Sequence, residues 1–382
     1  MRRVSSIVAY VRSKHPERWL AAYLLQRLGA WRERVPARGE RHLLVAVCDH
    51  FEPLWAADDG WAAVPEEVGA ARVRAWHERF PLLAAGYRDS EDRRPRHTFF
   101  FPAEQYRPHF LEPLADLARA GLGEVELHLH HDRDTAAGLR ATIHEALERF
   151  AAHGHLARDR AGRPRYAFIH GDWALANARE DGRRCGVDDE LAVLAETGCY
   201  ADFTFPAAPD ECQPPICNQI YWPVGDLTRR RAHYHGERAR VGRWYDDRPL
   251  LIQGPLALAL RARRIPVQLD NADLTHAFVA SPARLRTWIA QHVHVAGRPE
   301  WVFVKLHTHG APEDTAASLL GAGGHALHRA LAAVGEGPGG WRLHYVTARE
   351  MFNVACAAMQ GCRGNPARYR DHLLPPPPAA AG

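Results

Sequence analysis

A histidine-rich segment, Glu126-Leu127-His128-Leu129-His130-His131-Asp132, carries the most distinctive chemistry in this sequence. It ends a short apolar run that is typical of a β-strand, so it lies where a strand gives way to a loop. On an extended chain His128 and His130 point to the same side. Imidazole and carboxylate groups are the ligands that Zn²⁺ and related divalent ions prefer. We therefore predict a metal site at this segment, and the residues alone leave open which side chains bind the ion.

Ionisable residues also follow several other predicted strands. In a parallel α/β fold the functional groups gather where strands end and loops begin. One such residue commonly caps a neighbouring backbone group, but several together are costly to bury without a metal ion or close pairing. We therefore expect a divalent cation, with Zn²⁺ as the best match. The residues are Asp49 with His50, His170 with Asp172 and Trp173, Asp270 with Asn271, and Lys305 with His307 and His309.

Short apolar runs alternate with amphipathic stretches from His42 onward, as in a series of strand and helix units. The runs are apolar on both faces, which is typical of parallel strands that are covered on both sides. The predicted fold class is α/β, a (β/α)7-type distorted barrel with an N-terminal helical extension. The predicted strands are 43–48, 98–101, 124–128, 166–170, 200–205, 266–269, 302–307 and 343–346, and the predicted helices are 66–89, 107–121, 138–153, 187–197, 251–264, 282–295 and 322–334.

The chain divides into three predicted regions. Residues 1–40 form an N-terminal amphipathic helical segment, residues 41–360 form the barrel, and residues 361–382 form an extended or disordered tail. The basic N-terminal segment either packs on the domain or makes peripheral contact with an anionic membrane. The long segment 207–250 interrupts the alternation, and either a cap over the substrate or a surface excursion would account for it.

The composition argues against several classes of protein. A net charge of +4 over 382 residues gives no expectation of nucleic acid binding. The seven cysteines form no regular framework, and Cys212 with Cys217 lacks the second pair that a zinc finger needs. No apolar run approaches the roughly 20 residues that span a bilayer, and the start is too weakly apolar for a signal peptide. We therefore expect a cytoplasmic protein, with association to a membrane through the N-terminal helix as the alternative.

Several of these segments resemble, in chain order, the motifs of the polysaccharide deacetylase family, which carries the NodB homology domain. The family's Thr-Phe-Asp-Asp-Gly strand end looks like Val47-Cys48-Asp49-His50-Phe51. Its Glu-Ile-Gly-Asn-His-(Thr/Ser)-x-x-His motif looks like residues 124–132. The similarity extends over roughly residues 42–355. The other matching segments are 97–102, which is similar to the family's second strand, 196–206, similar to the stretch after its central helix, and 304–307, similar to its closing histidine motif.

The resemblance implies metal-dependent hydrolysis of an acetamide or acetyl ester on a sugar or glycoconjugate. The two aspartates of the family's first motif, a catalytic base and a metal ligand, correspond to Asp49 and His50. The final histidine of the second motif, also a ligand, corresponds to Asp132. The two exchanges are reciprocal, so the implied ligands are His50, His128 and Asp132. His130 or His131 could take the place of Asp132.

The roles of the remaining residues follow from the same resemblance. The metal would bind the carbonyl oxygen and a water, Asp49 would remove the proton of that water, and His307 would protonate the leaving group. Asp172 or Asp270 would hold an imidazole in the required tautomer. The arginine that orients the base in the family is missing, because its motif is replaced by His170-Gly171-Asp172-Trp173. The expected substrate-binding residues are His170, Trp173, Lys305 and His309.

Two other interpretations fit these residues. A different metal-dependent amidohydrolase would use the His128-Leu129-His130 pair, although that class places its His-x-His on the first strand, where this chain has Asp49-His50. A non-catalytic barrel that binds glycan would keep its affinity for ligand when Asp49 is lost. Redox chemistry is disfavoured, since the sequence has neither a Cys-x-x-Cys pair nor a nucleotide-binding glycine motif after a strand.

Overall fold

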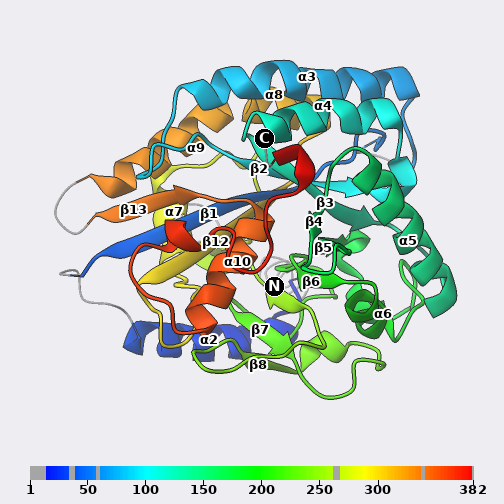
Figure 1. Cartoon of the computed structure of the whole chain (residues 1–382). Coiled ribbons are helices and arrows are strands. Elements are labelled where there is room, and N and C mark those ends of the chain that lie inside the picture. The colour runs from blue at the N-terminus through cyan, green and yellow to red at the C-terminus, as the bar shows by residue number, and fades with distance from the viewer. Residues whose placement is uncertain (1–13, 34–38, 57–60, 261–266, 337–339, 381–382) are drawn as a thin grey trace, which may run out of the picture.

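The computed structural model describes residues 14–33, 39–56, 61–260, 267–336 and 340–380. It has a mixed α/β architecture around a mostly parallel central sheet (Figure 1). The strands are β1 Arg41–His50, β2 His97–Pro102, β3 Gly123–Leu129, β4 Ala157–Arg158, β5 Pro164–His170, β6 Cys199–Asp202, β7 Ile220–Pro223, β8 Gly236–Arg238, β9 Leu250–Ile252, β10 Ala257–Leu260, β11 Val267–Asp270, β12 Trp301–Thr308 and β13 Trp341–Tyr345. The α-helices are α2 Pro16–Arg32, α3 Glu66–Ala85, α4 Pro108–Arg119, α5 Ala136–Ala152, α6 Glu190–Glu196, α7 Pro282–Ile289, α8 Glu313–Leu319, α9 Ala322–Ala332 and α10 Ala348–Met359.

The main sheet runs in the order β12-β1-β2-β3-β5-β6-β9-β7-β8, with β13 also paired to β1 and β4 to β5. The ladders from β12 through β9 are all parallel, as the alternation of strands and helices predicts. The register sets Cys48 beside His307 and Leu129 beside His170. Because parallel strands end at one edge of a sheet, the ionisable residues that follow them are collected at the carboxyl edge.

The ladders among the described strands do not close into a barrel. The antiparallel strands β7 and β8 extend the sheet beyond β9, and no ladder in the described residues joins β8 to β12. The two edges approach each other at an isolated parallel bridge between Arg240 and Ala296. The predicted α/β class is therefore confirmed, whereas the (β/α)7-type closure is not.

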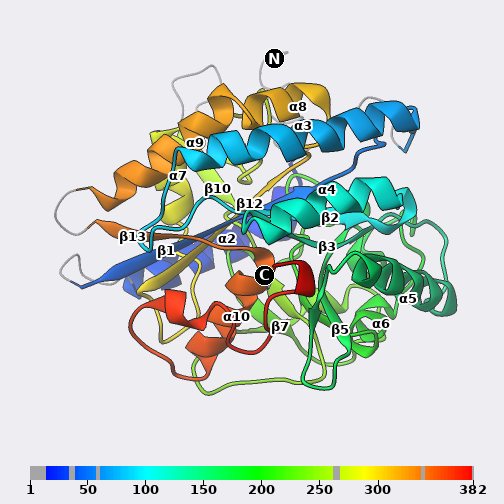
Figure 2. The same ribbon diagram turned by 45° about the horizontal axis from the view of Figure 1, so that its top comes forward.

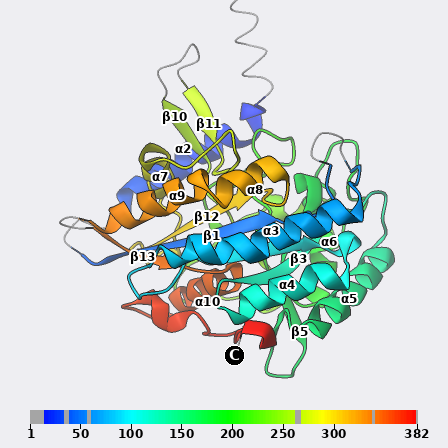
Figure 3. The same ribbon diagram turned by 90° about the horizontal axis from the view of Figure 1, so that it is seen from above.

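Side chains alternate between the two faces of the sheet and build two separate cores. The outer face, with Val45 and Phe99, packs under the helices α3, α4, α8 and α9, which lie together over the sheet in Figures 2 and 3. The inner face, with Leu44 and Cys48, packs against α10. Because His50 follows Cys48 at a spacing of two residues, it belongs to the inner face as well.

The predicted helix at 251–264 is wrong for residues 251–260, where β9 ends at Ile252, β10 begins at Ala257, and the four residues between them are irregular. The apolar run there is interrupted by Gly254, which lies so close to the main chain of β12 that a Cβ would stand 2.4 Å from the carbonyl oxygen of Lys305. Such proximity demands an extended segment with no side chain at this point. β10 pairs with β11 in a separate two-stranded sheet, and residues 261–264 of the prediction lie outside the described residues.

The long segment 207–250 supplies β7 and β8, which extend the main sheet with antiparallel pairs. Tyr221 and Trp222 on β7 are fully buried and belong to the core. The sequence could not reveal this pairing, since each strand is only a few residues long and carries no clear alternation.

The N-terminal helix α2 packs on the domain through Trp19 and Tyr23, which join a small core cluster with Leu256. The predicted helical segment outside Pro16–Arg32 includes residues 1–13 and 34–38, which lie outside the described residues. No helix in the described part of the chain is both long and apolar enough to cross a membrane. The opposite side of α2 is apolar and exposed at Leu24, Leu25, Leu28 and Trp31.

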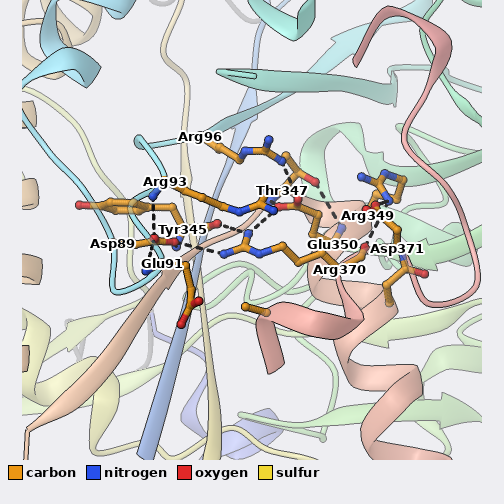
Figure 4. Close-up of polar contacts among 12 residues, drawn as sticks. Asp89, Glu91, Arg93, Arg96, Tyr345, Thr347, Arg349, Glu350, Arg370 and Asp371 are labelled. Carbon is orange, nitrogen blue, oxygen red and sulfur yellow. Dashed lines mark hydrogen bonds and ion pairs between the residues drawn. The ribbon is translucent and has the colours of Figure 1, made fainter. Parts of the chain in front are cut away.

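The C-terminal segment packs on the domain through residue 380, where an extended or disordered tail was expected. Arg370 is buried, its guanidinium lies 3.1 Å from Asp89 and 3.0 Å from Glu350, and it also donates to the carbonyl oxygen of Tyr345 (Figure 4). A buried arginine with several acceptors ties the segment to the sheet and to α10. Its proline-rich composition alone gives no sign of these contacts, and residues 381–382 lie outside the described part of the chain.

Candidate metal centre

Five ionisable side chains meet on the inner face of the carboxyl edge. β1 ends with His50, and Glu52 follows it at a spacing of two residues. β3 supplies His128, the chain just beyond it supplies His130, and the chain beyond β12 supplies His309. We call these five residues the candidate metal centre. Three of them are almost fully buried, at 3% exposure for His50, 2% for Glu52 and 0% for His128, so they need partners or an ion.

The carboxylate of Glu52 joins the imidazoles of the candidate metal centre. Its Oε1 lies 3.3 Å from Nε2 of His128 and 3.0 Å from Nε2 of His130, and its Oε2 lies 2.7 Å from Nδ1 of His309. Burial raises the pKa of Glu52, but the surrounding imidazoles outweigh this effect and hold that pKa well below its usual value. A lowered pKa favours the carboxylate form of Glu52, which is the form that can bind a cation.

Oxygen acceptors orient two of the imidazoles. Nδ1 of His128 lies 2.8 Å from the carbonyl oxygen of Ile169, and Nδ1 of His130 lies 2.7 Å from Oε1 of Glu104. Since these oxygens accept, each Nδ1 donates, and a neutral ring then directs the lone pair of its Nε2 at Glu52. A lone pair facing a carboxylate requires a cation between them, either a proton or a metal ion. Metal-binding histidines in proteins are held by outer acceptors in this way.

His50 favours a metal ion over a proton. Its Nε2 is buried and has no hydrogen-bond partner in the described part of the chain. The centroid of its ring lies 5.1 Å from that of His128 and 4.7 Å from that of His309. Burial, followed by the neighbouring imidazoles, lowers the pKa of His50 well below its usual value, so it offers a lone pair at neutral pH. Three imidazoles and one carboxylate are a ligand set that fits Zn²⁺.

A lone unpaired nitrogen would be weak support for this site. Buried imidazole nitrogens without a hydrogen bond also occur at His155 and His233 among the described residues. Neither histidine belongs to a described group of converging ligand atoms, whereas Glu52, His128 and His130 do, with ligand atoms within 4.8 Å of one another. The convergence of several donors therefore carries the argument.

Asp273, and His309 within the candidate metal centre, are the groups here that can exchange protons. His307 lies on the inner face of β12, and its Nε2 is 4.0 Å from Oδ1 of Asp273. Burial raises the pKa of Asp273 above its ordinary value. Burial lowers the pKa of His309, but Glu52 and Asp273 outweigh it and raise that pKa overall. The raised pKa makes Asp273 a stronger base than an ordinary carboxylate and favours the protonated form of His309.

Two predicted site residues lie outside the candidate metal centre. Asp49 points to the outer face, where its Oδ2 is 2.8 Å from Nε2 of His97 and its Oδ1 accepts the N–H of Gly310 at 2.6 Å. Asp132 lies in the loop after β3, and its carboxylate accepts the N–H of Arg184 at 2.6 Å. The structure brings His50, His128 and His130 together but does not bring Asp132 to them. The anionic position belongs to Glu52 instead.

The other predicted acids are also held elsewhere. Oδ2 of Asp172 accepts the indole N–H of Trp61 at 2.8 Å. Asp270 forms a buried ion pair with Arg284, with oxygen to nitrogen distances of 2.8 and 2.9 Å. Both carboxylates are thus held by local partners away from the candidate metal centre. The nearby Asp273 is the acid that faces His307 and His309.

The predicted substrate-binding residues take separate places. Lys305 is buried on the inner face of β12 and donates to the carbonyl oxygen of Phe205 at 3.1 Å, and burial lowers its pKa to about 8. Trp173 packs against the outer core. His170 lies on the outer face in a second group with His131, Cys185 and Glu190, which we call the lateral cluster.

Sequence reasoning missed Glu52, Asp273 and Glu190 as functional residues. A signal existed for Glu52, because it stands two residues after His50 just past the end of β1. Asp273 lies in an irregular turn after β11, and Glu190 is the first residue of a short helix, so neither belongs to a periodic pattern. Only the folded chain shows what these carboxylates face.

A cavity of about 300 Å³ opens beside the candidate metal centre. Glu52 and His130 form part of its wall, together with Trp55, Trp61 and Arg107. The ring of Trp55 lies 4.9 Å from that of His309. Aromatic faces and a guanidinium next to ligand atoms are typical of a site for a small polar molecule.

No model of a known protein family matches this sequence, and no curated protein sequence matches it either.

Proposed function

We propose that this chain is a metal-dependent hydrolase that removes an N- or O-acetyl group from a sugar or glycoconjugate. The observation that supports a hydrolase is the convergence of the ligand atoms of Glu52, His128 and His130 beside a cavity, with the ring of His50 next to that of His128. The acetylated substrate and the distorted barrel rest on the resemblance of the strand-end motifs to polysaccharide deacetylases.

His50, Glu52, His128 and His130 would hold Zn²⁺ or a related ion, which supplies polarisation of a carbonyl group and a lowered pKa of water when bound. His309 would act as the proton donor rather than as a ligand: its Nδ1–H donates to Glu52, and in the imidazolium form its Nε2 would carry a second proton for the leaving group. Asp273 would accept a proton through its raised pKa. Asp49 would position His309 through the N–H of Gly310 rather than act as the base.

The cavity would bind the sugar. Trp55 and Trp61 offer faces on which a sugar ring stacks, and Arg107 offers donors for its hydroxyl or carboxylate groups. Trp61 is held by Asp172 and lies under the guanidinium of Arg184, at 4.2 Å from its ring centroid. The loop that carries Asp172 would therefore shape the substrate site without touching the ion.

Metal content and acetate release test this proposal together. We expect the purified protein to retain a divalent metal and to release acetate from an acetylated sugar, and we expect His128→Ala to lose both. His144→Ala is the matched control, because His144 is an exposed histidine on α5. A His128→Ala protein that keeps the full metal content would overturn the proposed centre.

His309→Gln separates hydrolysis from binding. In a hydrolase this substitution should lower kcat by about 10²–10⁴-fold at unchanged metal content, since a general acid contributes on that scale. A barrel that only binds glycan would show no turnover in either protein. Metal together with turnover of another amide, but no acetate release, would indicate the amidohydrolase alternative.

A further inference from the structure

The lateral cluster joins four potential metal ligands on the outer face of the sheet. His131 follows β3, His170 ends β5, and Cys185 and Glu190 lie before and at the start of α6. Cys185, His170 and Glu190 are each 0% exposed. The ligand atoms of all four residues lie within 4.8 Å of one another. The cluster shares no ligand with the candidate metal centre, because His130 faces Glu52 whereas His131 faces His170 and Glu190.

Three of the four printed distances within the lateral cluster are close to those around a tetrahedral ion, and the two imidazole nitrogens lie closer together than an ion between them would hold them. Nε2 of His131 and Nε2 of His170 are 2.9 Å apart, and they lie 3.2 and 3.3 Å from Oε1 of Glu190. Sγ of Cys185 lies 3.5 Å from Oε2 of Glu190. Ligand bonds to Zn²⁺ of about 2.0–2.3 Å at tetrahedral angles place nitrogen, oxygen and sulfur ligands roughly 3.3–3.6 Å from one another.

Outer acceptors orient both imidazoles of the lateral cluster toward this point. Nδ1 of His131 lies 3.1 Å from Oδ2 of Asp134, and Nδ1 of His170 lies 2.5 Å from the carbonyl oxygen of Gly171. Each Nδ1 therefore donates, and two neutral rings would direct the lone pairs of both Nε2 atoms at each other. One proton between the rings could also relieve this contact, and Sγ of Cys185 would then keep only its contacts to Oε2 of Glu190 and the carbonyl oxygen of Val187, at 3.5 and 3.7 Å.

A divalent cation satisfies all four residues at once. A thiolate and a carboxylate with two neutral imidazoles neutralise its charge, which matters where no solvent can do so. Thiolate with imidazole selects Zn²⁺ over Mg²⁺ or Ca²⁺. From this donor set and geometry we propose that the lateral cluster is a second, structural zinc site, separate from the proposed hydrolytic centre. Binding would deprotonate Cys185 and release that proton to solvent.

The proposed zinc site would fix the loop that shapes the cavity. Oε2 of Glu190 also accepts the N–H of Ala176 at 2.6 Å, and the loop between β5 and α6 includes Asp172, Trp173, Ala176 and Asn177 in left-handed conformations. Such backbone is costly and persists only where its surroundings hold it. An ion shared by β3, β5 and α6 would hold this loop, and with it the contact of Asp172 to Trp61.

Titration of the metal-free full chain with Co²⁺ distinguishes the two sites, because only the lateral cluster contains a thiol. We expect two ions per chain and a thiolate-to-cobalt charge-transfer band in the near ultraviolet. Cys185→Ser should abolish the band and one of the two ions, whereas His128→Ala should remove one ion and keep the band. Cys362→Ser, which changes a cysteine outside both groups, should leave both signals intact.

Wild-type protein that saturates with Co²⁺ without a thiolate band would overturn the second site, and so would a band that survives Cys185→Ser. A band with no loss of metal in His128→Ala would instead overturn the hydrolytic centre alone. Asp134→Asn gives a further readout, since it keeps all four ligands but weakens the orientation of His131. We expect it to lower the affinity of the lateral site about 10–100-fold, and unchanged affinity would count against the assignment.

Discussion

At the scale of single residues, what separates a ligand from an ordinary buried histidine is the group that its second nitrogen faces. His128 and His155 both donate one ring N–H to a backbone carbonyl oxygen, at 2.8 and 3.1 Å. The free nitrogen of His128 then meets Glu52, whereas that of His155 has no partner among the described residues. Position in the sequence does not reveal this difference, because it depends on residues far along the chain from each histidine.

Substitution of Glu104 tests whether its contact with His130 orients that ring for metal binding. It contacts the ring nitrogen of His130 that faces away from the candidate metal centre, so Glu104→Gln should leave all ligands in place. We expect it to weaken metal binding about 10–100-fold, as the loss of an outer partner does. Competition with a chromogenic chelator measures this change, and Glu112→Gln, at an exposed glutamate on α4, is the control. Equal affinity of the two variants would contradict the assignment of His130 as a ligand.

Burial of His155 predicts how the stability of the protein depends on pH. Burial lowers its pKa from 6.5 to about 4, so the folded protein keeps it neutral where the unfolded chain would take up a proton. Its contribution to stability is therefore complete above pH 6.5 and is lost as the pH falls toward 4. We expect the free energy of unfolding of the wild type to fall relative to that of His155→Gln across this window, by at most about 1.4 kcal/mol per pH unit.

Urea denaturation of both proteins at several pH values gives that difference directly. Comparing the two proteins cancels the titration of the other buried histidines, because they are common to both. A difference that stays constant from pH 6.5 to 4 would show that the pKa of His155 is not lowered by burial.

At the scale of elements, Gly171 at the end of β5 allows the close approach of the chain at the end of β3, which carries His130. A Cβ on Gly171 would stand 2.2 Å from Cδ2 of His130. We therefore expect Gly171→Ala to displace His130 and weaken metal binding in equilibrium dialysis, although it changes no ligand. Gly29→Ala on α2 is the control, because a Cβ there meets nothing within 4 Å and alanine should stabilise the helix by up to about 1 kcal/mol. Retention of wild-type affinity in Gly171→Ala would contradict the proposed position of His130.

Each of the eight predicted strands overlaps a strand of the structure, because apolar runs that alternate with helical patterns are a strong signal. The order of β7, β8 and β9 was not predictable, since their pairing depends on contacts between segments far apart in the sequence. The same limit applies to the site. The strand ends supplied His50, His128 and His130, but the sequence could not show that the chain turns Asp132 away from them and brings in Glu52.

At the scale of the whole molecule, the C-terminal segment completes the domain through Arg370 (Figure 4). Arg370→Met would leave Asp89 and Glu350 buried without this partner. Loss of one member of a buried ion pair typically costs about 3–5 kcal/mol, and we expect a decrease of that size in the free energy of unfolding, measured with urea. Arg368→Met, at an exposed arginine two residues away, should be nearly neutral. Equal stability of the two variants would mean that the segment contributes little to folding.

The peptide bond between His130 and His131 connects the two proposed ion sites. A rotation of this unit that brings one ring closer to its ion carries the next ring away from the other. If both ions bind, each therefore changes the affinity of its neighbour by the same factor, as thermodynamic reciprocity requires. Insertion or deletion of one residue before His130 would exchange the directions of the two rings. Evolution of this stretch is therefore expected to proceed by substitution and to conserve its length.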